Sequence, residues 1–467
     1  MPELLLSAVN MAIGLPEALI ADLTQQGSLF EVGGTVRDAL LTGQPPSKDF
    51  DYLVTGIPYE QLCRLLKNHG RVDVVGKSFG VIKFLPHDSP PHTSAPFDFA
   101  LPRREYSTGV GHRDFAVEFD HALPVEADLV RRDFTINAIA REVTTGKFVD
   151  PLDGRGDLQR KLIRHTSPES FKEDPLRMLR AVQFAARFEF AIEPETFQSM
   201  CDQAHLITTI TPERIAEELN KLLLKARKPS IGFLLMQKSG LLKLILPELE
   251  AAVGVTQPGP YHKWPVFEHT LAVVDAAPLD LQLRMAALLH DLGKPATKRL
   301  TDSGSSFYGH DALGTRLAHS ILERLRYSND LIDSVCRLVE RHMFTTDVTD
   351  KGLRRLIRKA GLDLIFPLLE LRRADTIGQG MGQTNDDVDE LERRIRAELD
   401  KKPPFGLADL ALDGNDIMRE FNLQPGPAVG KILNHLLEYV LDYPEHNDYQ
   451  TLLIEAKRYY ASQSDNG

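Results

Sequence analysis

Short runs rich in β-branched and other apolar residues recur along the chain between residues 29 and about 150. Residues 72–75, 81–85 and 116–119 are examples, and segments with helical spacing separate them. This alternation predicts a region built from strands and helices. Beyond residue 155 strand signals almost vanish, and helical periodicity continues to the C-terminus. The pattern therefore predicts an α+β protein in which a strand-containing head is followed by domains made of helices.

Proline and glycine divide the helical part of the chain. Prolines interrupt the helical pattern at positions 194, 212, 229 and 247, and Pro258-Gly259-Pro260 lies within residues 254–265. A second break, at residues 401–406, precedes an acidic tail. A chain of 467 residues exceeds one ordinary core. We expect five segments: a helical lead-in (1–28), the head (29–150), a helical neck and body (151–247), a second helical module (248–400) and a helical tail (401–467).

The composition is that of a globular protein, with 42% hydrophobic and 26% charged residues. The net charge of −11 argues at first against a nucleic-acid partner, because phosphate binding needs local Lys and Arg. The charge is unevenly distributed, however. Residues 381–467 hold 17 acidic and 9 basic residues, whereas residues 151–245 hold 15 basic and 12 acidic residues. The helical middle of the chain could therefore face RNA.

The cysteines and the apolar runs indicate the compartment. Cys63, Cys201 and Cys336 are far apart and fit neither a metal-binding nor a disulfide spacing. We expect them to be reduced, as in the cytoplasm. No apolar stretch approaches the roughly 18 residues that a membrane span needs, and the N-terminus lacks the pattern of a secretory signal. We therefore expect a cytoplasmic protein with no membrane partner.

Three aspartates in strand-like surroundings form the first candidate site. Asp49 and Asp51 are one residue apart, so in a strand both carboxylates point to the same side while Phe50 faces the core. Asp98, between two phenylalanines on another expected strand, would supply a bridging ligand. Mg²⁺ prefers oxygen ligands, and a pair of such ions suits phosphoryl transfer. The trio predicts a two-metal centre, although an isolated Asp-x-Asp is usually solvated or caps a helix.

The residues before this trio support the interpretation. Residues 30–41 are typical of a strand, a Gly33-Gly34 turn and then a helix. Such a turn offers backbone N–H groups and a helix N-terminus to a triphosphate. Arg37, about one turn into the helix, could add a cationic fork to the phosphates.

Charged residues before two apolar stretches form the second candidate site. Arg132 could bind phosphate and Asp133 could accept a hydrogen bond from a ribose hydroxyl; the alternative is a pair of salt bridges at a helix start. Asp174 and Arg177 are three residues apart on an expected helix and would share a face. Because a carboxylate only accepts and a guanidinium only donates, the pair matches cytosine and adenine and refuses uracil and guanine. Out of context, such a pair is usually an ordinary helix salt bridge.

Five segments resemble, in order, the motifs of class II tRNA nucleotidyltransferases, the CCA-adding enzymes and their bacterial poly(A) polymerase relatives. They are VGGTVRDALL, DFDYLV, LVRRDFTINAIA, EDPLRMLRAVQFAARF and TPERIAEEL, within residues 29–245. The resemblance implies a DNA-polymerase-beta-like head with Asp49 and Asp51 as metal ligands, and a helical neck, body and tail that hold the acceptor end of tRNA. It also implies nucleotide contacts from Gly34, Arg37, Arg132, Asp133, Asp174, Arg177 and Arg180.

Residues 102–113 lie between the aspartates and Arg132 and resemble the flexible loop that such enzymes need for the terminal adenosine. This resemblance favours an enzyme that adds A over one that adds C alone. The sequence does not separate complete CCA addition from A addition only, and a poly(A) polymerase is the nearest alternative.

Histidines and aspartates of the second helical module form the third candidate site. Its members are His269, the adjacent pair His290-Asp291, His310, His342 and Asp375. Imidazole and carboxylate together suit a divalent transition metal or magnesium. Such a metal would provide a water that attacks a phosphate ester. A single histidine on an apolar helix is usually a core residue, but the whole combination is much harder to explain in that way.

Residues 250–380 resemble the HD superfamily of metal-dependent phosphohydrolases. The resemblance implies that His269, His290, Asp291 and Asp375 are metal ligands and that His310 and His342 make accessory metal or phosphate contacts. In some bacteria, HD modules attached to CCA-adding enzymes are associated with 2′,3′-cyclic phosphodiesterase and phosphatase activity. The sequence leaves the identity of the metal and the activity of the module open.

We therefore predict an enzyme that adds C, C and A to the tRNA 3′ end from CTP and ATP, without a nucleic-acid template. The RNA 3′-hydroxyl would attack the α-phosphate beside Asp49, Asp51 and Asp98, releasing pyrophosphate. The expected cofactors are Mg²⁺ in the head and a divalent metal in the second module, and no DNA partner is expected. The alternative from another class is an HD phosphohydrolase with a nucleotide-sensing head, against which the intact aspartate trio argues. The oligomeric state is not indicated.

Overall fold

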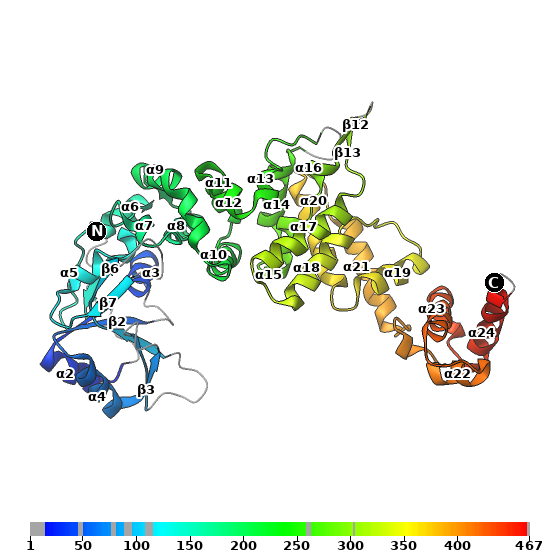
Figure 1. Ribbon diagram of the computed structural model, residues 1–467, viewed down its shortest axis with the longest axis horizontal. Coiled ribbons are helices and arrows are strands. Elements are labelled where there is room, and N and C mark those ends of the chain that lie inside the picture. Colours follow the sequence, from blue (N-terminus) through cyan, green and yellow to red (C-terminus); the bar gives the residue numbers. More distant parts are fainter. Residues whose placement is uncertain are drawn as a thin grey trace. The chain divides into compact units, whose positions relative to one another are not determined.

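The computed structural model describes residues 15–44, 50–75, 81–87, 96–107, 115–257, 263–301 and 304–464. The chain forms two compact units, Met1–Pro247 and Glu248–Gly467 (Figure 1). Among the helices of the described residues, none has the length and apolar character that crossing a membrane would require.

A seven-stranded mixed sheet organises the head of the first unit, in the order β3-β4-β5-β2-β1-β8-β9. β2 and β5 pair in parallel, and the other neighbours pair antiparallel. The strands are β1 (Ser28–Val32), β2 (Asp51–Thr55), β3 (Gly70–Val75), β4 (Val81–Pro86), β5 (Phe97–Ala100), β8 (Ala140–Glu142) and β9 (Phe148–Val149). The strands expected at residues 72–75 and 81–85 are β3 and β4.

Helices make up most of the rest of the first unit, and α8, α10 and α11 pack together in its helical part. The helices are α2 (Glu17–Gln26), α3 (Gly34–Thr42), α4 (Tyr59–His69), α5 (Val125–Leu129), α6 (Gly154–Arg160), α7 (Ser170–Glu173), α8 (Arg177–Phe188), α9 (Pro194–Gln203), α10 (Pro212–Lys225), α11 (Pro229–Ser239) and α12 (Leu241–Ile245). α13 (Pro247–Glu250) begins at the last residue of this unit and continues into the second. Short 3-10 turns η1 (Thr135–Asn137) and η2 (Ala204–Thr209) and the two-residue strands β10 (Leu162–Ile163) and β11 (Ala191–Ile192) complete it.

Each face of the head sheet has its own apolar core, because side chains alternate between the faces along a strand. On one face, Leu29 and Tyr52 belong to a buried cluster that also contains leucines of α2 and α4. On the other face, Phe30 and Leu53 pack with residues of α5. Asp51 and Asp98 flank residues of the first cluster along β2 and β5, so their side chains point to the second face.

Residues 102–113, which were expected to form a flexible loop, are in part a strand. β6 (Arg103–Ser107) pairs antiparallel with β7 (Phe115–Phe119) and forms a hairpin. Residues 103–107, Arg-Arg-Glu-Tyr-Ser, do not alternate between polar and apolar, so no period-two pattern indicated this strand. The expected strand at 116–119 is β7, and residues 108–113 lie outside the described part of the chain.

Helices dominate the second unit. α14, α15, α17, α18 and α20 pack against one another, and a separate apolar cluster joins α22, α23 and α24. The helices are α14 (Val266–Ala276), α15 (Leu281–Leu289), α16 (Lys294–Thr297), α17 (His310–Arg324), α18 (Asn329–Arg341), α19 (Asp350–Ala360), α20 (Ile365–Gly378), α21 (Asp386–Asp400), α22 (Gly414–Phe421), α23 (Pro427–Asp442) and α24 (Tyr449–Ser464). A small hairpin, β12 (Arg299–Thr301) with β13 (Gly304–Ser306), and the 3-10 turns η3 (Leu407–Asp409) and η4 (Pro444–His446) complete it.

Candidate functional site

Three polar side chains stand in one row across the head sheet. Asp51 lies opposite Asp98 in the parallel pair β2–β5, and Lys83 lies opposite Asp98 in the antiparallel pair β4–β5. Lys83 Nζ donates to Oδ1 and Oδ2 of Asp98 at 3.0 and 3.3 Å. Asp51 and Asp98 thus offer hard oxygen ligands on adjacent strands, which suits magnesium. Asp49 lies outside the described residues, so its role as a ligand stays a prediction.

Gly33 forms the turn between β1 and α3. Its φ of +68° lies in the left-handed region, which favours glycine. A Cβ at this position would lie 2.7 Å from Nη1 of Arg132 and 3.8 Å from Oδ2 of Asp51. Glycine therefore lets the Arg132 guanidinium approach the turn beside the carboxylate. The strand, turn and helix expected around Gly33 and Gly34 are present as β1 and α3.

Seven of the predicted site residues line one cavity of about 960 Å³: Asp51, Asp98, Arg132, Asp133, Asp174, Arg177 and Arg180. This volume is typical of a site for a small ligand, which occupies roughly 300–1,000 Å³. Arg103, Arg131, Arg214 and Lys221 also line the cavity and give it further positive charge, which suits a polyphosphate.

Asp128 holds Arg132 in place at the end of α5. It is fully buried, and its Oδ2 accepts hydrogen bonds from Nε and Nη2 of Arg132 at 3.2 and 3.0 Å. Burial raises the pKa of Asp128, but Arg132 and Arg131 outweigh that effect and hold the pKa below its usual value. The salt bridges that were the alternative at this segment therefore exist, and they orient an arginine that also lines the cavity.

Asp133 connects the cavity to the interior of the unit. Its Oδ2 accepts hydrogen bonds from Nε and Nη2 of Arg180 at 2.8 and 2.6 Å, and its Oδ1 accepts one from Asn137 at 2.9 Å. Asn137 in turn accepts from Nη1 of Arg37 at 2.6 Å. Arg37 is only 4% exposed and is not among the residues that line the cavity. A phosphate contact by Arg37 stays a prediction, and its present contacts support Asp133.

The expectation that Asp174 and Arg177 share one helix is wrong. α8 begins at Arg177, whereas Asp174 follows the end of α7 with an extended backbone, φ −141° and ψ 99°. The reason is Pro175, because a proline disfavours the helical conformation of the residue before it. Both side chains nevertheless line the same cavity. The turn before α8 therefore places the two side chains near each other, as a shared helix face was expected to do.

Each member of this pair has its own support. Arg177 donates from Nη1 to Oγ of Ser170 at 2.9 Å and to Oε2 of Glu173 at 3.0 Å, and from Nη2 to the carbonyl oxygen of Arg131. Asp174 accepts from Nη2 of Arg214 at 2.9 Å. The sequence interpretation missed Arg214, although the residue lies within the quoted segment TPERIAEEL. It also missed Lys83, for which a lysine inside the apolar run 81–85 was the available signal.

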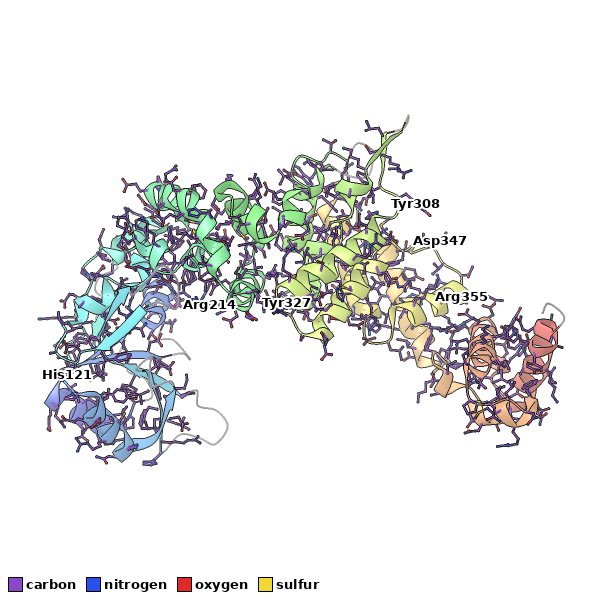
Figure 2. All side chains as sticks on the ribbon, in the orientation of Figure 1. His121, Arg214, Tyr308, Tyr327, Asp347 and Arg355 are labelled. Carbon is purple, nitrogen blue, oxygen red and sulfur yellow. The ribbon has the colours of Figure 1, made fainter. Side chains whose placement is uncertain are left out.

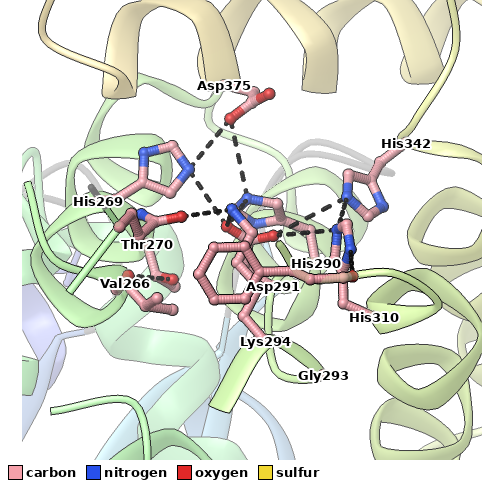
Figure 3. A network of polar contacts seen from close by, with 12 residues as sticks. Val266, His269, Thr270, His290, Asp291, Gly293, Lys294, His310, His342 and Asp375 are labelled. Atoms are coloured by element: carbon pink, nitrogen blue, oxygen red, sulfur yellow. Dashed lines mark hydrogen bonds and ion pairs between the residues drawn. The ribbon is translucent and has the colours of Figure 1, made fainter. Parts of the chain in front are cut away.

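All six predicted residues of the second unit lie together (Figure 3). They fall into two groups, His269 with His290 and Asp375, and Asp291 with His310 and His342, and the ligand atoms of each group lie within 4.8 Å of one another. Asp291 also contacts the first group, because its Oδ2 lies 3.2 Å from Nε2 of His290. Its Oδ1 lies 3.6 Å from Nε2 of His310. The cluster therefore has one carboxylate between two sets of donors.

Backbone carbonyl groups fix the orientation of three of these imidazoles. Nδ1 of His290, His310 and His342 lies 2.8, 2.8 and 2.6 Å from the carbonyl oxygens of Ala287, Phe307 and Val339. With the Nδ1 proton donated in this way, each Nε2 presents a lone pair toward Asp291. Lone pairs that face a carboxylate repel it unless a cation lies between them. The donor set therefore fits divalent metal binding.

The carboxylates of the cluster attract positive charge. Burial lowers the pKa of His269, but hydrogen bonds to Asp291 and Asp375 outweigh it and raise the pKa to about 9, so a metal ion that binds Nε2 at pH 7 must displace a proton. Burial and the neighbouring His290 lower the pKa of His342 to about 4, so this imidazole stays neutral at pH 7. Gly293 brings α15 and α17 close enough for the cluster, because a Cβ there would lie 2.0 Å from the carbonyl oxygen of His310.

The cluster opens into a cavity of about 780 Å³. Two basic residues that the sequence interpretation missed line it. Lys294 is buried and donates to Gln257 at 2.7 Å, and its Nζ lies 2.6 Å from Oδ2 of Asp291. Arg372 is one quarter exposed, and its Nη1 lies 3.8 Å from Oδ2 of Asp375. A phosphate ester in this cavity would meet both positive charge and the metal ligands.

The fold and the head cavity define a nucleotidyltransferase, and comparison with known proteins specifies which one. Three family models match: the poly A polymerase head domain at residues 29–164, a model described as the probable RNA and SrmB-binding site of polymerase A at 189–253, and the tRNA nucleotidyltransferase domain 2 at 311–456. The multifunctional CCA protein of Burkholderia mallei (strain SAVP1) is 38% identical over 343 residues, which cover 71% of this chain and 78% of the relative. That of Janthinobacterium sp. (strain Marseille) is 39% identical over 320 residues, covering 67% and 72%.

Solved structures share the fold. The Bacillus stearothermophilus CCA-adding enzyme in complex with CTP matches with a TM-score of 0.69 and 22% identity, over 96% of this chain and 98% of that one. The Thermotoga maritima CCA-adding enzyme complexed with tRNA CCA matches with a TM-score of 0.55 and 18% identity, over 97% and 98%. The chain belongs to the CCA-adding tRNA nucleotidyltransferase family, whose reaction depends on a divalent metal ion. The predicted CCA-adding family, the nucleotidyltransferase head with a mostly helical remainder, and the transferase class are confirmed. The resemblance of residues 250–380 to the HD superfamily stays a prediction.

Proposed function

We propose that this chain completes the 3′ end of tRNA by adding C, C and A from CTP and ATP in the cytoplasm, without a nucleic-acid template. The observation that carries the proposal is the head cavity, where Asp51 and Asp98 lie opposite each other on adjacent strands beside Asp174 and Arg177. Carboxylates suited to bind metal and side chains suited to read a base thus line one space. That combination is what selection of a nucleotide and transfer of its α-phosphate to RNA require.

The residues of the cavity would have different roles in the reaction. Asp51 and Asp98, with Asp49, would hold Mg²⁺, which when bound lowers the charge that builds up on the phosphates. Arg132 and Arg180 would bind the triphosphate and stabilise the departing pyrophosphate. The attacking group is the RNA 3′-hydroxyl: its oxygen bonds to the α-phosphorus while the bond from that phosphorus to the bridging oxygen of pyrophosphate breaks.

Asp174 and Arg177 would choose the base. Cytosine and adenine each present an amino donor beside a ring-nitrogen acceptor, which match a carboxylate and a guanidinium. We expect Asp174→Ala to keep some turnover and to lose discrimination against UTP and GTP. Unchanged base choice in this variant would contradict the selection role.

The main test supplies purified protein with a tRNA that lacks its 3′ end and offers the four nucleotides singly and together, with products resolved at one-nucleotide steps. Addition of C, C and A that then stops supports the proposal. Addition of A alone identifies an A-adding enzyme, and a long A tract identifies a poly(A) polymerase. Asp51→Asn should abolish all three, whereas Asp73→Asn, an exposed aspartate on β3 outside the cavity, should change nothing.

For the second unit we propose a metal-dependent phosphohydrolase activity on cyclic or terminal phosphates at a ribose 3′ end. The supporting observation is the six-residue cluster, whose imidazole and carboxylate donors suit divalent transition metals and whose cavity holds Lys294 and Arg372. Such a metal supplies an acidic bound water at neutral pH. In a 2′,3′-cyclic phosphodiester, the water oxygen would bond to phosphorus while the P–O3′ bond breaks and O3′ takes up a proton from the water, leaving a 2′-monoester and the 3′-hydroxyl that a nucleotidyltransferase could use.

Hydrolysis of adenosine 2′,3′-cyclic phosphate tests this second activity. The protein is treated with a chelator and then supplied separately with Mg²⁺, Mn²⁺, Co²⁺ and Ni²⁺. His290→Ala should abolish metal-dependent hydrolysis, and Asp51→Asn should leave it intact. If the wild-type protein hydrolysed the cyclic phosphate but extended no tRNA, the head would be a sensor and the alternative function would hold.

A further inference from the structure

An exposed aromatic side chain lies at the rim of the second-unit cavity. Tyr308 is 94% exposed, lies on the segment between β13 and α17 (Figure 2), and lines the same cavity as the candidate metal ligands. We propose that Tyr308 is a nucleobase-binding residue, which stacks on the base of a terminal nucleotide while the phosphate of that nucleotide lies at the histidine cluster. The inference rests on the proposed phosphohydrolase function and narrows its substrate class to nucleoside and RNA-end phosphates.

The cavity lining has two parts of different chemistry. The first consists of the candidate metal ligands with two basic side chains, and it suits a phosphate. The second consists of apolar and amide side chains: Phe307, Tyr308, Met343, Gln379 and Gln383. The volume of about 780 Å³ lies within the roughly 300–1,000 Å³ of pockets that hold whole organic ligands, so a phosphate group alone would leave most of it unfilled.

Two hydrogen bonds connect the backbone beside Tyr308 to the cluster. The carbonyl oxygen of Phe307 accepts from the backbone N–H of His310 at 3.1 Å and lies 2.8 Å from Nδ1 of the same residue. Gly309 completes this turn with a φ of +77°, in the left-handed region that favours glycine. The Phe307 ring is held as well, because Nζ of Lys294 lies 5.6 Å from its centroid. The backbone of Tyr308 is therefore fixed relative to a candidate metal ligand.

The other side chains of this second part also suit a base. Met343 directly follows His342 and is 59% exposed, and its thioether can contact the edge of an aromatic ring. Every base has a π face that can stack on a tyrosine ring. The amide groups of Gln379 and Gln383 carry both a donor and an acceptor, so they can meet the edge of any base. We therefore expect this site to require a base without strong selection among the four.

The test compares two substrates with the same cyclic phosphate: adenosine 2′,3′-cyclic phosphate, and methyl riboside 2′,3′-cyclic phosphate, which has no base. Stacking of a base on an aromatic ring changes affinity by about 5- to 150-fold, so Tyr308→Ala should lower kcat/KM for the adenosine compound by a factor in this range. The value for the methyl riboside should not change. Tyr308→Phe should keep the preference for the adenosine compound, because the ring remains. Tyr449→Ala is the matched control, since Tyr449 is a 40% exposed tyrosine on α24 that is not among the residues lining the cavity.

Hydrogen exchange supplies a readout that does not depend on turnover. With Mn²⁺ present, adenosine 2′-monophosphate should protect the peptide that covers Met343, and Tyr308→Ala should raise the concentration required for half of that protection. Methyl riboside 2-phosphate should bind the variant and the wild-type protein equally.

An unchanged preference for the adenosine compound in Tyr308→Ala overturns the inference. So does an equal loss for both cyclic phosphates, because that result indicates damage to the cluster and not loss of a base contact. If the wild-type protein hydrolyses neither compound, the proposed phosphohydrolase function fails, and the protection measurements still decide whether Tyr308 binds a base.

Discussion

Asp133→Asn is the sharpest test of the network beneath the head cavity. The carboxylate accepts four hydrogen bonds: two from Arg180, one from Asn137 and one from the backbone N–H of Phe134 at 2.9 Å. An amide of the same shape keeps one acceptor oxygen and replaces the other with an NH₂ donor. Whichever way it turns, the NH₂ group faces donors, either the Arg180 fork or the N–H groups of Asn137 and Phe134.

The expected cost follows from burial. Removing one partner of a buried ion pair costs about 3–5 kcal/mol. Asp133 is 7% exposed, but the Arg180 side chain is 33% exposed and keeps some hydration, so the lower end of that range, about 3 kcal/mol, applies. For a unit of this size, such a loss corresponds to a decrease in melting temperature of roughly 6–12 °C.

The assay is hydrogen exchange of the full-length protein, read on peptides that cover α8. Intrinsic fluorescence would not serve, because the only tryptophan, Trp264, lies in the second unit. Asp202→Asn, at an exposed aspartate bonded to Gln198, is the control and should change stability by less than about 0.5 kcal/mol. A loss below about 1 kcal/mol in Asp133→Asn would refute the claim that this network holds the cavity together.

The dependence of stability on acidic pH is a second test of the same network. Burial raises the pKa of Asp133, but Arg180, Asn137 and Arg177 outweigh it and hold the pKa below its usual value. A carboxylate with a lowered folded-state pKa contributes stability that is present above its unfolded pKa, about 3.9, and is lost as pH falls through the folded-state value. Asp133→Asn should lack this part of the acid dependence. An identical acid profile for both proteins would contradict the assignment.

Three further outcomes follow from the structure. Burial raises the pKa of Glu31 to about 7 despite Arg141, 3.6 Å away, so the stability of the wild-type protein should fall as pH rises from about 4.5 to 7. The loss should reach up to about 3 kcal/mol, and Glu31→Gln should remove it. Urea titrations at several pH values measure both. Arg354→Ala should raise hydrogen exchange in α23, because the buried arginine donates to Glu398 at 2.8 Å and to the Leu441 carbonyl, and its loss costs about 3–5 kcal/mol. Mn²⁺ at about 100 times its dissociation constant should stabilise the second unit by roughly 2.7 kcal/mol in thermal melts, and His290→Ala should cancel the effect.

Local pattern was sufficient for much of the architecture. The strand–turn–helix around Gly33 follows from backbone chemistry that neighbouring residues determine, and β1 and α3 are found there. The six candidate ligands of the second unit were also identifiable, because several imidazole and carboxylate groups within apolar helical segments have few other reasons to occur together. The structure places those residues in one cluster.

Long-range pairing was not accessible in the same way. Arg214 donates to Asp174, which lies 40 positions earlier in the chain. Lys83 contacts Asp98 across a strand pair, and no local pattern predicts the register of that pair. Arg37 was expected at the phosphates because its helix begins at the glycine turn. Its guanidinium lies 5.0 and 4.9 Å from the ring centroids of Phe184 and Phe188, two contacts that the local pattern did not indicate. Sequence periodicity indicates that a residue faces inward but not which partner it meets.

The two proposed centres differ in ligand chemistry, and that difference separates their metals. The head site offers carboxylate oxygens on adjacent strands, and oxygen ligands favour Mg²⁺. The second site offers four imidazole nitrogens with two carboxylates, and nitrogen ligands favour transition metals over Mg²⁺. When several divalent cations are present, we therefore expect each unit to prefer a different one. If both proposed activities hold, removal of transition metals should stop hydrolysis of blocked ends in the second unit while Mg²⁺ in the head still permits extension of free ends.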